Sequence, residues 1–92
     1  MKVILSAQAV KDLRSIRSYV GEHSPKAADR LGRRLIETCE SLAVFPDRGR
    51  PGSEPGTRES VVIWPYVIAY RVGQDEVQIL HVRHGAQGEH GD

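Results

Sequence analysis

The sequence predicts an α+β fold in which a two-helix antiparallel hairpin packs on a small, mainly antiparallel sheet, in the order β-α-α-β-β-β. Apolar residues recur at helical spacing over residues 7–44, a segment rich in proline and glycine follows, and three runs rich in β-branched and aromatic residues come after it. A chain of 92 residues has room for one hydrophobic core. We therefore expect a single domain over residues 1–85 and a flexible C-terminal tail over residues 86–92.

The first predicted elements are a strand and a helix that join directly. The apolar, β-branched run from Val3 to Leu5 predicts a short strand. Ser6 follows as a candidate N-cap, and from Ala7 the apolar period becomes that of a helix, which ends near Gly21. The predicted buried stripe of this helix is Ala9, Val10, Leu13, Ile16, Tyr19 and Val20.

The second helix has the clearest start signal in the chain. Ser24 is a candidate N-cap, and Pro25 occupies the first helical position. The helical pattern runs to about Val44, and Pro46 then disfavours helical geometry at the residue before it. The predicted buried stripe of this helix is Ala28, Leu31, Leu35, Cys39 and Leu42. Because only a few residues separate the two helices, we expect them to form an antiparallel hairpin.

The rest of the chain predicts a loop followed by a meander of strands. Residues 46–57 hold three prolines and three glycines, a composition typical of a surface loop. Strands are predicted over residues 58–64, 66–72 and 76–83. Pro65 and residues 73–75 separate them, so the three strands are expected to form two hairpins.

The predicted sheet is apolar on both faces. One face of the third strand carries Tyr66, Ile68 and Tyr70, and the other carries Val67, Ala69 and Arg71. In the fourth strand, alternation places Val77 and Ile79 on one face and Leu80 and Val82 on the other.

A single helical hairpin covers only one face of such a sheet. Monomeric proteins rarely expose a large contiguous apolar patch, so we expect a partner protein to cover the face that the helices leave open, which is either the face that carries Val67 and Ala69 or the opposite one. The alternative is that the twist of the sheet and the loop of residues 46–57 cover this face.

Composition excludes several classes of function. The net charge is +1 and the pI is about 8.0, below the value of roughly 9 that marks strong direct nucleic-acid binding. The apolar run near the N-terminus is too short for a signal or a membrane span, and the single cysteine, Cys39, indicates a reducing compartment. We expect a cytoplasmic protein without a membrane partner, with Cys39 as a packing residue.

No residue pattern in the sequence indicates a metal or a cofactor. The four histidines lack cysteine or carboxylate companions at ligand spacing, and the chain contains neither a phosphate-binding loop nor a nucleophile elbow. We therefore expect no metal and no cofactor.

Cationic side chains gather at the ends of the predicted strands. They are Arg58, Arg71, His81, Arg83 and His84. Alternation separates His84 from the face that carries His81 and Arg83. Cleavage of RNA without a metal requires a base, an acid and cations that stabilise the developing charge. Arg58, Arg71, Arg83 and His84 are the candidates for such a set.

A binding role for these cations is the favoured interpretation. The arginines then pair with acidic residues of a partner or simply solvate strand ends, and the modest net charge favours this over RNA cleavage. Trp64, which precedes Pro65, is interpreted as an anchor at a hairpin end rather than a platform for base stacking.

Five motifs, in order, resemble the ParE branch of the ParE/RelE toxin superfamily of type II toxin–antitoxin systems. They are A-x-x-D-L-x-x-I-x-x-Y (9–19), S-P-x-A-A (24–28), L-x-x-F-P-D-R-G-R-P (42–51), I-A-Y-R-V (68–72) and V-Q-I-L-H-V-R-H-G (77–85). The resemblance covers nearly the whole chain, from Val3 to about Gly85.

The resemblance implies a toxin that a cognate antitoxin neutralises. ParE-like toxins poison DNA gyrase by binding and without chemistry of their own, and such systems act in plasmid stabilisation. RelE-like toxins cleave ribosome-bound mRNA, using basic and aromatic residues on the sheet and at its C-terminal end. The antitoxins of the superfamily wrap the toxin with a helix and an extended segment. The residues after Gly85 lack the basic or aromatic ending common in the RNA-cleaving relatives.

We therefore expect a gyrase-binding toxin rather than an enzyme. One alternative is a ribosome-dependent mRNA endoribonuclease, and a second is an inactive member that only helps its antitoxin bind the operator. The antitoxin is expected to contact the helical hairpin and one face of the sheet. The candidate residues for binding the antitoxin or the target are Arg58, Trp64, Val67, Ala69, Arg71, His81, Arg83 and His84.

Overall fold

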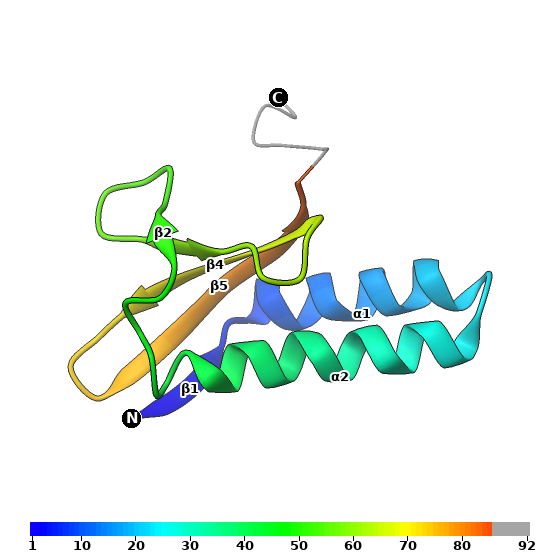
Figure 1. Ribbon diagram of the computed structural model, residues 1–92, viewed down its shortest axis with the longest axis horizontal. Helices are drawn as coiled ribbons and strands as arrows, with labels where there is room; N and C mark the ends of the chain where they lie inside the picture. The colour runs from blue at the N-terminus through cyan, green and yellow to red at the C-terminus, as the bar shows by residue number, and fades with distance from the viewer. Residues whose placement is uncertain (86–92) are drawn as a thin grey trace.

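The computed structural model describes residues 1–85, and the predicted flexible tail of residues 86–92 lies outside the described residues. The elements are β1 (Lys2–Leu5), α1 (Ala7–Gly21), α2 (Pro25–Ser41), β2 (Arg50–Pro51), β3 (Arg58–Ser60), β4 (Tyr66–Val72) and β5 (Glu76–His84). The strands form one sheet in the order β1-β5-β4-β3-β2, in which β1 runs parallel to β5 and the other neighbours are antiparallel. The helical hairpin lies along one face of this sheet (Figure 1). The predicted fold class is confirmed, with β2 as an additional short strand.

Both helices begin where the sequence predicts, because each has a serine that caps its first turn. The Ser6 hydroxyl accepts the Ala9 N–H at 3.0 Å, and the Ser24 hydroxyl accepts the Ala27 N–H at 3.2 Å. The helix α2 ends at Ser41 rather than near Val44, and the residues in between form turns that close on Ser41. The hairpin predicted from the short connection is present.

The core fills the space between the hairpin and the sheet. Its largest fully buried side chains include Leu35 and Leu42 from the α2 region, Ile68 and Tyr70 from β4, and Ile79 from β5. Cys39 belongs to the same core, so its predicted packing role is confirmed. Burial, together with the charge of Glu40, raises the pKa of the Cys39 thiol to about 11.

The predicted strand over residues 58–64 is wrong in its second half. Only Arg58–Ser60 form β3, and the chain then turns back towards β4. Ile63 points into the core and its carbonyl accepts the Tyr66 N–H at 2.9 Å, whereas Val62 and Trp64 point to solvent. A run of consecutive apolar residues is compatible with a buried strand or with a turn. In the turn that forms here, only Ile63 of this run reaches the core, whereas Val62 and Trp64 do not.

A β-bulge overturns the predicted alternation in β5. Tyr70 pairs with Ile79 while Ala69 pairs with His81, so Leu80 has no partner residue in β4. Because Leu80 is an extra residue in the strand, Val82 faces the helices, although simple alternation places it on the other side. Val82 is buried in the core together with Val77 and Ile79.

The N-cap of α1 and a residue of its second turn bind the backbone groups that the bulge leaves without a partner in β4. The Ser6 hydroxyl donates to the Leu80 carbonyl at 2.7 Å, and the Asp12 carboxylate accepts the Val82 N–H at 2.9 Å. A buried backbone group without a partner is costly, so these two side chains stabilise the bulge.

Tyr70 fixes the loop between α2 and β3. Its buried hydroxyl accepts the Gly49 N–H at 2.9 Å and donates to the Pro46 carbonyl at 2.8 Å. Gly49 lies so close that a Cβ atom there would be 2.5 Å from the Tyr70 hydroxyl oxygen. Arg58 adds a hydrogen bond to the Gly49 carbonyl at 2.9 Å and an ion pair with Asp47 at 3.5 Å. The predicted loop is therefore an ordered segment.

The expected apolar patch on the second face of the sheet is not present. Val67 and Ala69 are only 1% and 4% exposed within the chain itself. Segment 46–57 rises on the side of the sheet away from the helices (Figure 1), and Gly56 within it lies against the Arg71 guanidinium. The alternative, in which the chain covers its own sheet, is the one the structure adopts.

Candidate functional site

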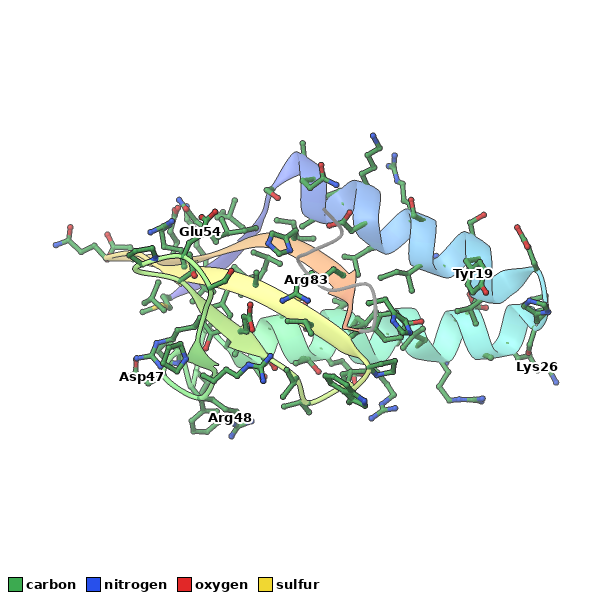
Figure 2. All side chains as sticks on the ribbon, turned by 90° about the horizontal axis from the view of Figure 1, so that it is seen from above. Tyr19, Lys26, Asp47, Arg48, Glu54 and Arg83 are labelled. Atoms are coloured by element: carbon green, nitrogen blue, oxygen red, sulfur yellow. The ribbon has the colours of Figure 1, made fainter. Side chains whose placement is uncertain are left out.

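The face of the sheet that points away from the helices, here called the open face, carries most of the residues that the sequence singles out. The register places Arg83 opposite Val67, His81 opposite Ala69, and Gln78 opposite Arg71. These residues share one face because directly opposed residues of antiparallel strands do so. Figure 2 looks onto this face, and Arg83 lies over the middle of the sheet. The predicted separation of His84 from His81 and Arg83 is confirmed.

A buried carboxylate at the centre of the open face holds two arginines. One oxygen of Glu59 accepts from Nε and Nη2 of Arg50 at 3.1 and 3.0 Å, and the other accepts from Nη2 of Arg83 at 3.1 Å. Glu59 is 7% exposed, so its charge is compensated by these contacts rather than by water. The Glu59 carboxylate thus fixes the direction of the Arg83 side chain.

Glu59 and Arg50 are members of this face that the sequence analysis missed. Glu59 alternates with Arg58 in the strand sequence R-E-S, and this alternation already places it on the face opposite Arg58. An acidic residue on a strand that is otherwise buried is the signal that identifies it. The position of Arg50 depends on the short strand β2, which a loop composition does not predict.

Arg71 lies on the open face at the next position of β4 on that face after Ala69, the residue that pairs with Glu59. Two positions of β4 separate Arg71 from Ala69 and four separate it from Val67, the partner of Arg83, which corresponds to about 7 and 13 Å along a strand. Its side chain is exposed, and a Cβ atom on Gly56 would be 2.9 Å from its Nη1 atom. Within residues 1–85, Arg71 makes no ion pair.

Arg58 and His84 lie on the helix-facing side of the sheet. Arg58 is opposite Tyr70 and binds the loop at Asp47 and Gly49. His84 is opposite Tyr66, and their rings make an edge-to-face contact with 5.5 Å between centroids. The four residues considered for RNA cleavage are therefore divided between the two faces of the sheet.

Trp64 lies beside the end of β5 and remains 65% exposed. The Gly85 N–H donates to the Pro65 carbonyl at 2.6 Å, and a Cβ atom on Gly85 would be 3.0 Å from Trp64 Cη2. The indole thus lies against the backbone where β5 leaves the sheet. Its role as an anchor stays a prediction.

The chemistry available on the open face is that of anion recognition. A guanidinium group donates hydrogen bonds and accepts none, so Arg50, Arg71 and Arg83 offer donors to an anion. The Glu59 carboxylate is occupied by two guanidinium groups, and His81 is the one imidazole on this face among residues 1–85. Such a set recognises carboxylates or phosphates better than it transfers protons.

Residues 1–85 contain no group of three or more His, Cys, Asp or Glu side chains placed to hold a metal ion. Neither helix in this range has the length and apolar character needed to cross a bilayer.

A family model described as "ParE toxin of type II toxin-antitoxin system, parDE" matches residues 3–88. The chain belongs to the ParE/RelE toxin superfamily. Toxin RelE2 of Caulobacter vibrioides is 43% identical over 86 residues, which cover 94% of this chain and 97% of the relative. Putative toxin Y4kP of Sinorhizobium fredii is 40% identical over 87% of this chain and 83% of its own length.

Solved structures of this superfamily share the fold. The chromosomal ParDE toxin–antitoxin system from P. aeruginosa contains a chain that matches with a TM-score of 0.80 and 28% identity, covering 91% of this chain and 95% of that one. The RelBE2 toxin–antitoxin complex from Mycobacterium tuberculosis matches with a TM-score of 0.68 and 25% identity, over 90% and 95% of the two chains. ParE/RelE membership identifies a type II toxin, and the relatives carry names from both branches.

Proposed function

We propose that this toxin acts on DNA gyrase by binding, as a ParE-type toxin, and that a co-encoded antitoxin neutralises it in the cytoplasm. The observation that carries the proposal is the division of the candidate nuclease residues. Arg71 and Arg83 lie on the open face, whereas Arg58 and His84 lie on the helix-facing side. Residues on opposite faces of a sheet do not converge on one phosphodiester, so they do not form a general acid–base pair.

The electrostatics of the open face support a binding role. Glu59 fixes Arg83 in a defined direction, and Arg71 keeps an exposed guanidinium further along the same face. Preorganised guanidinium groups bind planar anionic groups of a protein partner with little loss of side-chain entropy. We propose this face, with Arg71, His81 and Arg83 on it and Trp64 beside the end of β5, as the contact surface for the target or the antitoxin. Val67 and Ala69 are buried beneath these side chains and do not contribute to the contact.

A ribosome-dependent mRNA endoribonuclease is the second candidate function. It is favoured by relatives that are named RelE toxins, among them the relative at 43% identity. It would draw on His81 and Arg83, which share the open face. An inactive, regulatory member is the third possibility, and toxicity on expression separates it from the other two.

Two assays on the purified chain distinguish the first two candidates. A gyrase supercoiling assay measures loss of supercoiling and accumulation of cleaved DNA, and an in vitro translation assay with a labelled mRNA measures cleavage of the message. We expect inhibition of gyrase with intact mRNA. Arg83→Ala is expected to weaken the inhibition, whereas Arg14→Ala, which removes an exposed arginine from α1, leaves it unchanged.

Cut mRNA with unimpaired supercoiling would overturn the proposal in favour of the endoribonuclease. Expression without any growth defect, in the absence of the neighbouring gene, would favour the regulatory member. Growth inhibition that the neighbouring gene relieves is the expected result.

A further inference from the structure

The Arg83 side chain crosses a neighbouring strand to reach Glu59. Arg83 pairs with Val67 on one side of β4, and Glu59 pairs with Ala69 on the other side of the same strand. At least two strand spacings, about 10 Å, therefore separate the backbones of β5 and β3 at this point. Nη2 of Arg83 nevertheless donates to Oε2 of Glu59 at 3.1 Å, so the Arg83 side chain lies over β4. Figure 2 shows Arg83 above the middle of the sheet.

The Glu59 carboxylate is itself held from both sides. Its Oε1 atom accepts from Nε and Nη2 of Arg50 on β2, and this contact directs Oε2 towards Arg83. The Glu59 side chain is only 8% exposed, so these hydrogen bonds form in a setting that water barely reaches. Arg50 thus orients Glu59, and Glu59 orients Arg83.

Stability alone does not account for a carboxylate at this position. Apolar residues in place of a buried ion pair often give a fold of equal or greater stability. A rotating arginine, by contrast, loses side-chain entropy when it binds a partner, which weakens binding by about threefold to tenfold for each such side chain. A carboxylate that holds the guanidinium beforehand removes this loss. The Arg83 side chain is 19% exposed, so part of it is accessible from the open face.

We propose that Glu59 is a positioning residue of the contact surface, which strengthens the binding of gyrase by holding Arg83 in its binding direction without touching the partner. Arg50 supports Glu59 through the second carboxylate oxygen. This inference rests on the proposed binding of gyrase and adds a determinant of that binding that is buried beneath the surface. The structural alternative is that Glu59 only keeps the Arg83 side chain over Val67 and Ala69, where its aliphatic part covers apolar surface.

A double-mutant cycle of Glu59→Gln and Arg83→Ala separates these two roles. The measured quantity is the toxin concentration that halves gyrase supercoiling. We expect Arg83→Ala to raise this concentration by about tenfold to a hundredfold. Glu59→Gln keeps the length of the side chain but removes its charge, and it should raise the concentration by about threefold to tenfold. The double variant should need no higher concentration than Arg83→Ala alone, because Glu59 acts through Arg83.

Glu59→Asp provides a second variant that keeps the charge. Its side chain is one methylene shorter, so the carboxylate no longer spans both arginines, and we expect the same loss of about threefold to tenfold. A role through net charge alone predicts no loss in this variant. Urea unfolding of each variant establishes that it is folded under the assay conditions, and Glu59→Asp replaces Glu59→Gln in the cycle if Glu59→Gln is unfolded.

The matched control is Asp29→Asn. It also turns a carboxylate that pairs with an arginine into an amide, but the pair, with Arg17, lies on the helical hairpin. Because this pair is exposed and far from the open face in the fold, the control should keep the half-inhibitory concentration within about twofold of the wild-type value.

Three results would overturn the inference while the binding of gyrase stands. The first is an additive cycle, in which Glu59→Gln weakens inhibition by the same factor with and without Arg83. The second is wild-type inhibition by both Glu59→Gln and Glu59→Asp together with a lowered unfolding midpoint, which would assign Glu59 to the fold alone. The third is wild-type inhibition by Arg83→Ala. If the unmodified chain left gyrase supercoiling unimpaired, the proposed function itself would fail, and the inference with it.

Discussion

The Asp12 carboxylate of α1 accepts the Val82 backbone N–H of β5 at 2.9 Å, across 70 positions of sequence. This contact explains why an acidic residue lies on the sheet-facing border of an otherwise apolar helical stripe. It satisfies a strand N–H at the point where the bulge at Leu80 interrupts pairing with β4. The helix and the bulge therefore depend on each other.

Asp12→Ala is expected to destabilise the fold by about 1–3 kcal/mol, because it leaves the Val82 N–H buried without an acceptor. Asp12→Asn keeps a side-chain oxygen and should restore at least half of the loss. The measurement is urea unfolding, read from the midpoint at constant slope. Asp29→Ala is the control, since it removes only an exposed ion pair with Arg17, and a shift as large as that of Asp12→Ala would contradict the prediction.

Two glycine substitutions are expected to act in opposite directions. In Gly49→Ala the new Cβ atom would be 2.5 Å from the Tyr70 hydroxyl oxygen and 2.7 Å from the Glu59 carbonyl, so the loop must move and stability falls by about 2 kcal/mol or more. In Gly32→Ala the nearest atom is Cδ of Arg17 at 3.9 Å, and the helix interior gains about 0.5–1 kcal/mol. Thermal unfolding of both variants checks the signs, and a stabilised Gly49→Ala would refute the role of Tyr70 in fixing the loop.

The single cysteine provides a test of core burial through pH. Burial raises the pKa of Cys39 from an ordinary 9.0 to about 11, so at pH 8 the folded chain holds about a hundredfold less thiolate than the unfolded chain. Alkylation of Cys39 by iodoacetamide should be slower in the native chain by at least that factor. In denaturant, its rate should rise to that of an exposed thiol. Since the unfolded thiol ionises first, unfolding releases a proton between pH 9 and 11, and the free energy of unfolding falls as pH rises through that window. Equal alkylation rates in the native and denatured chains would contradict this description of the core.

Arg83→Ala and Arg71→Ala are expected to weaken binding of the antitoxin or the target, by different amounts. Arg83 is held by Glu59, so its removal also leaves a buried carboxylate with one partner fewer, and affinity should fall about tenfold to a hundredfold. Arg71 is exposed, and its loss should cost about threefold to tenfold and mainly slow association. Calorimetry and growth assays measure both effects. Unchanged affinity and unchanged toxicity in both variants would remove these residues from the site.

Much of the fold was predictable because its local signals agree with its tertiary packing. Ser6 and Ser24 cap helices where the sequence places them, and β4 has the predicted bounds. The bulge at Leu80 was not predictable, because periodicity cannot show where an extra residue enters a strand unless the residues that stabilise it, Ser6 and Asp12, are also known to be near.

The site was predictable in part for the same reason. Alternation correctly separates His84 from His81 and Arg83, since it depends on the backbone alone. It does not reveal that Val67 and Ala69 are buried within the chain itself, because alternation assigns a side chain to a face and does not say what covers that face. Nor does it reveal the buried charge of Glu59, which is stabilised by residues from two other strands.

The pairing of β1 with β5 joins strands that are far apart in the sequence, since Lys2 pairs with Glu76. Residues Val77, Ile79 and Val82 complete the core from β5, and β1 has no neighbour in the sheet until they arrive. The helices are synthesised before β5, so the sheet and its core close only after residues 76–84 have been made. A fragment that stops before residue 76 therefore lacks three core side chains and leaves β1 without its neighbour in the sheet.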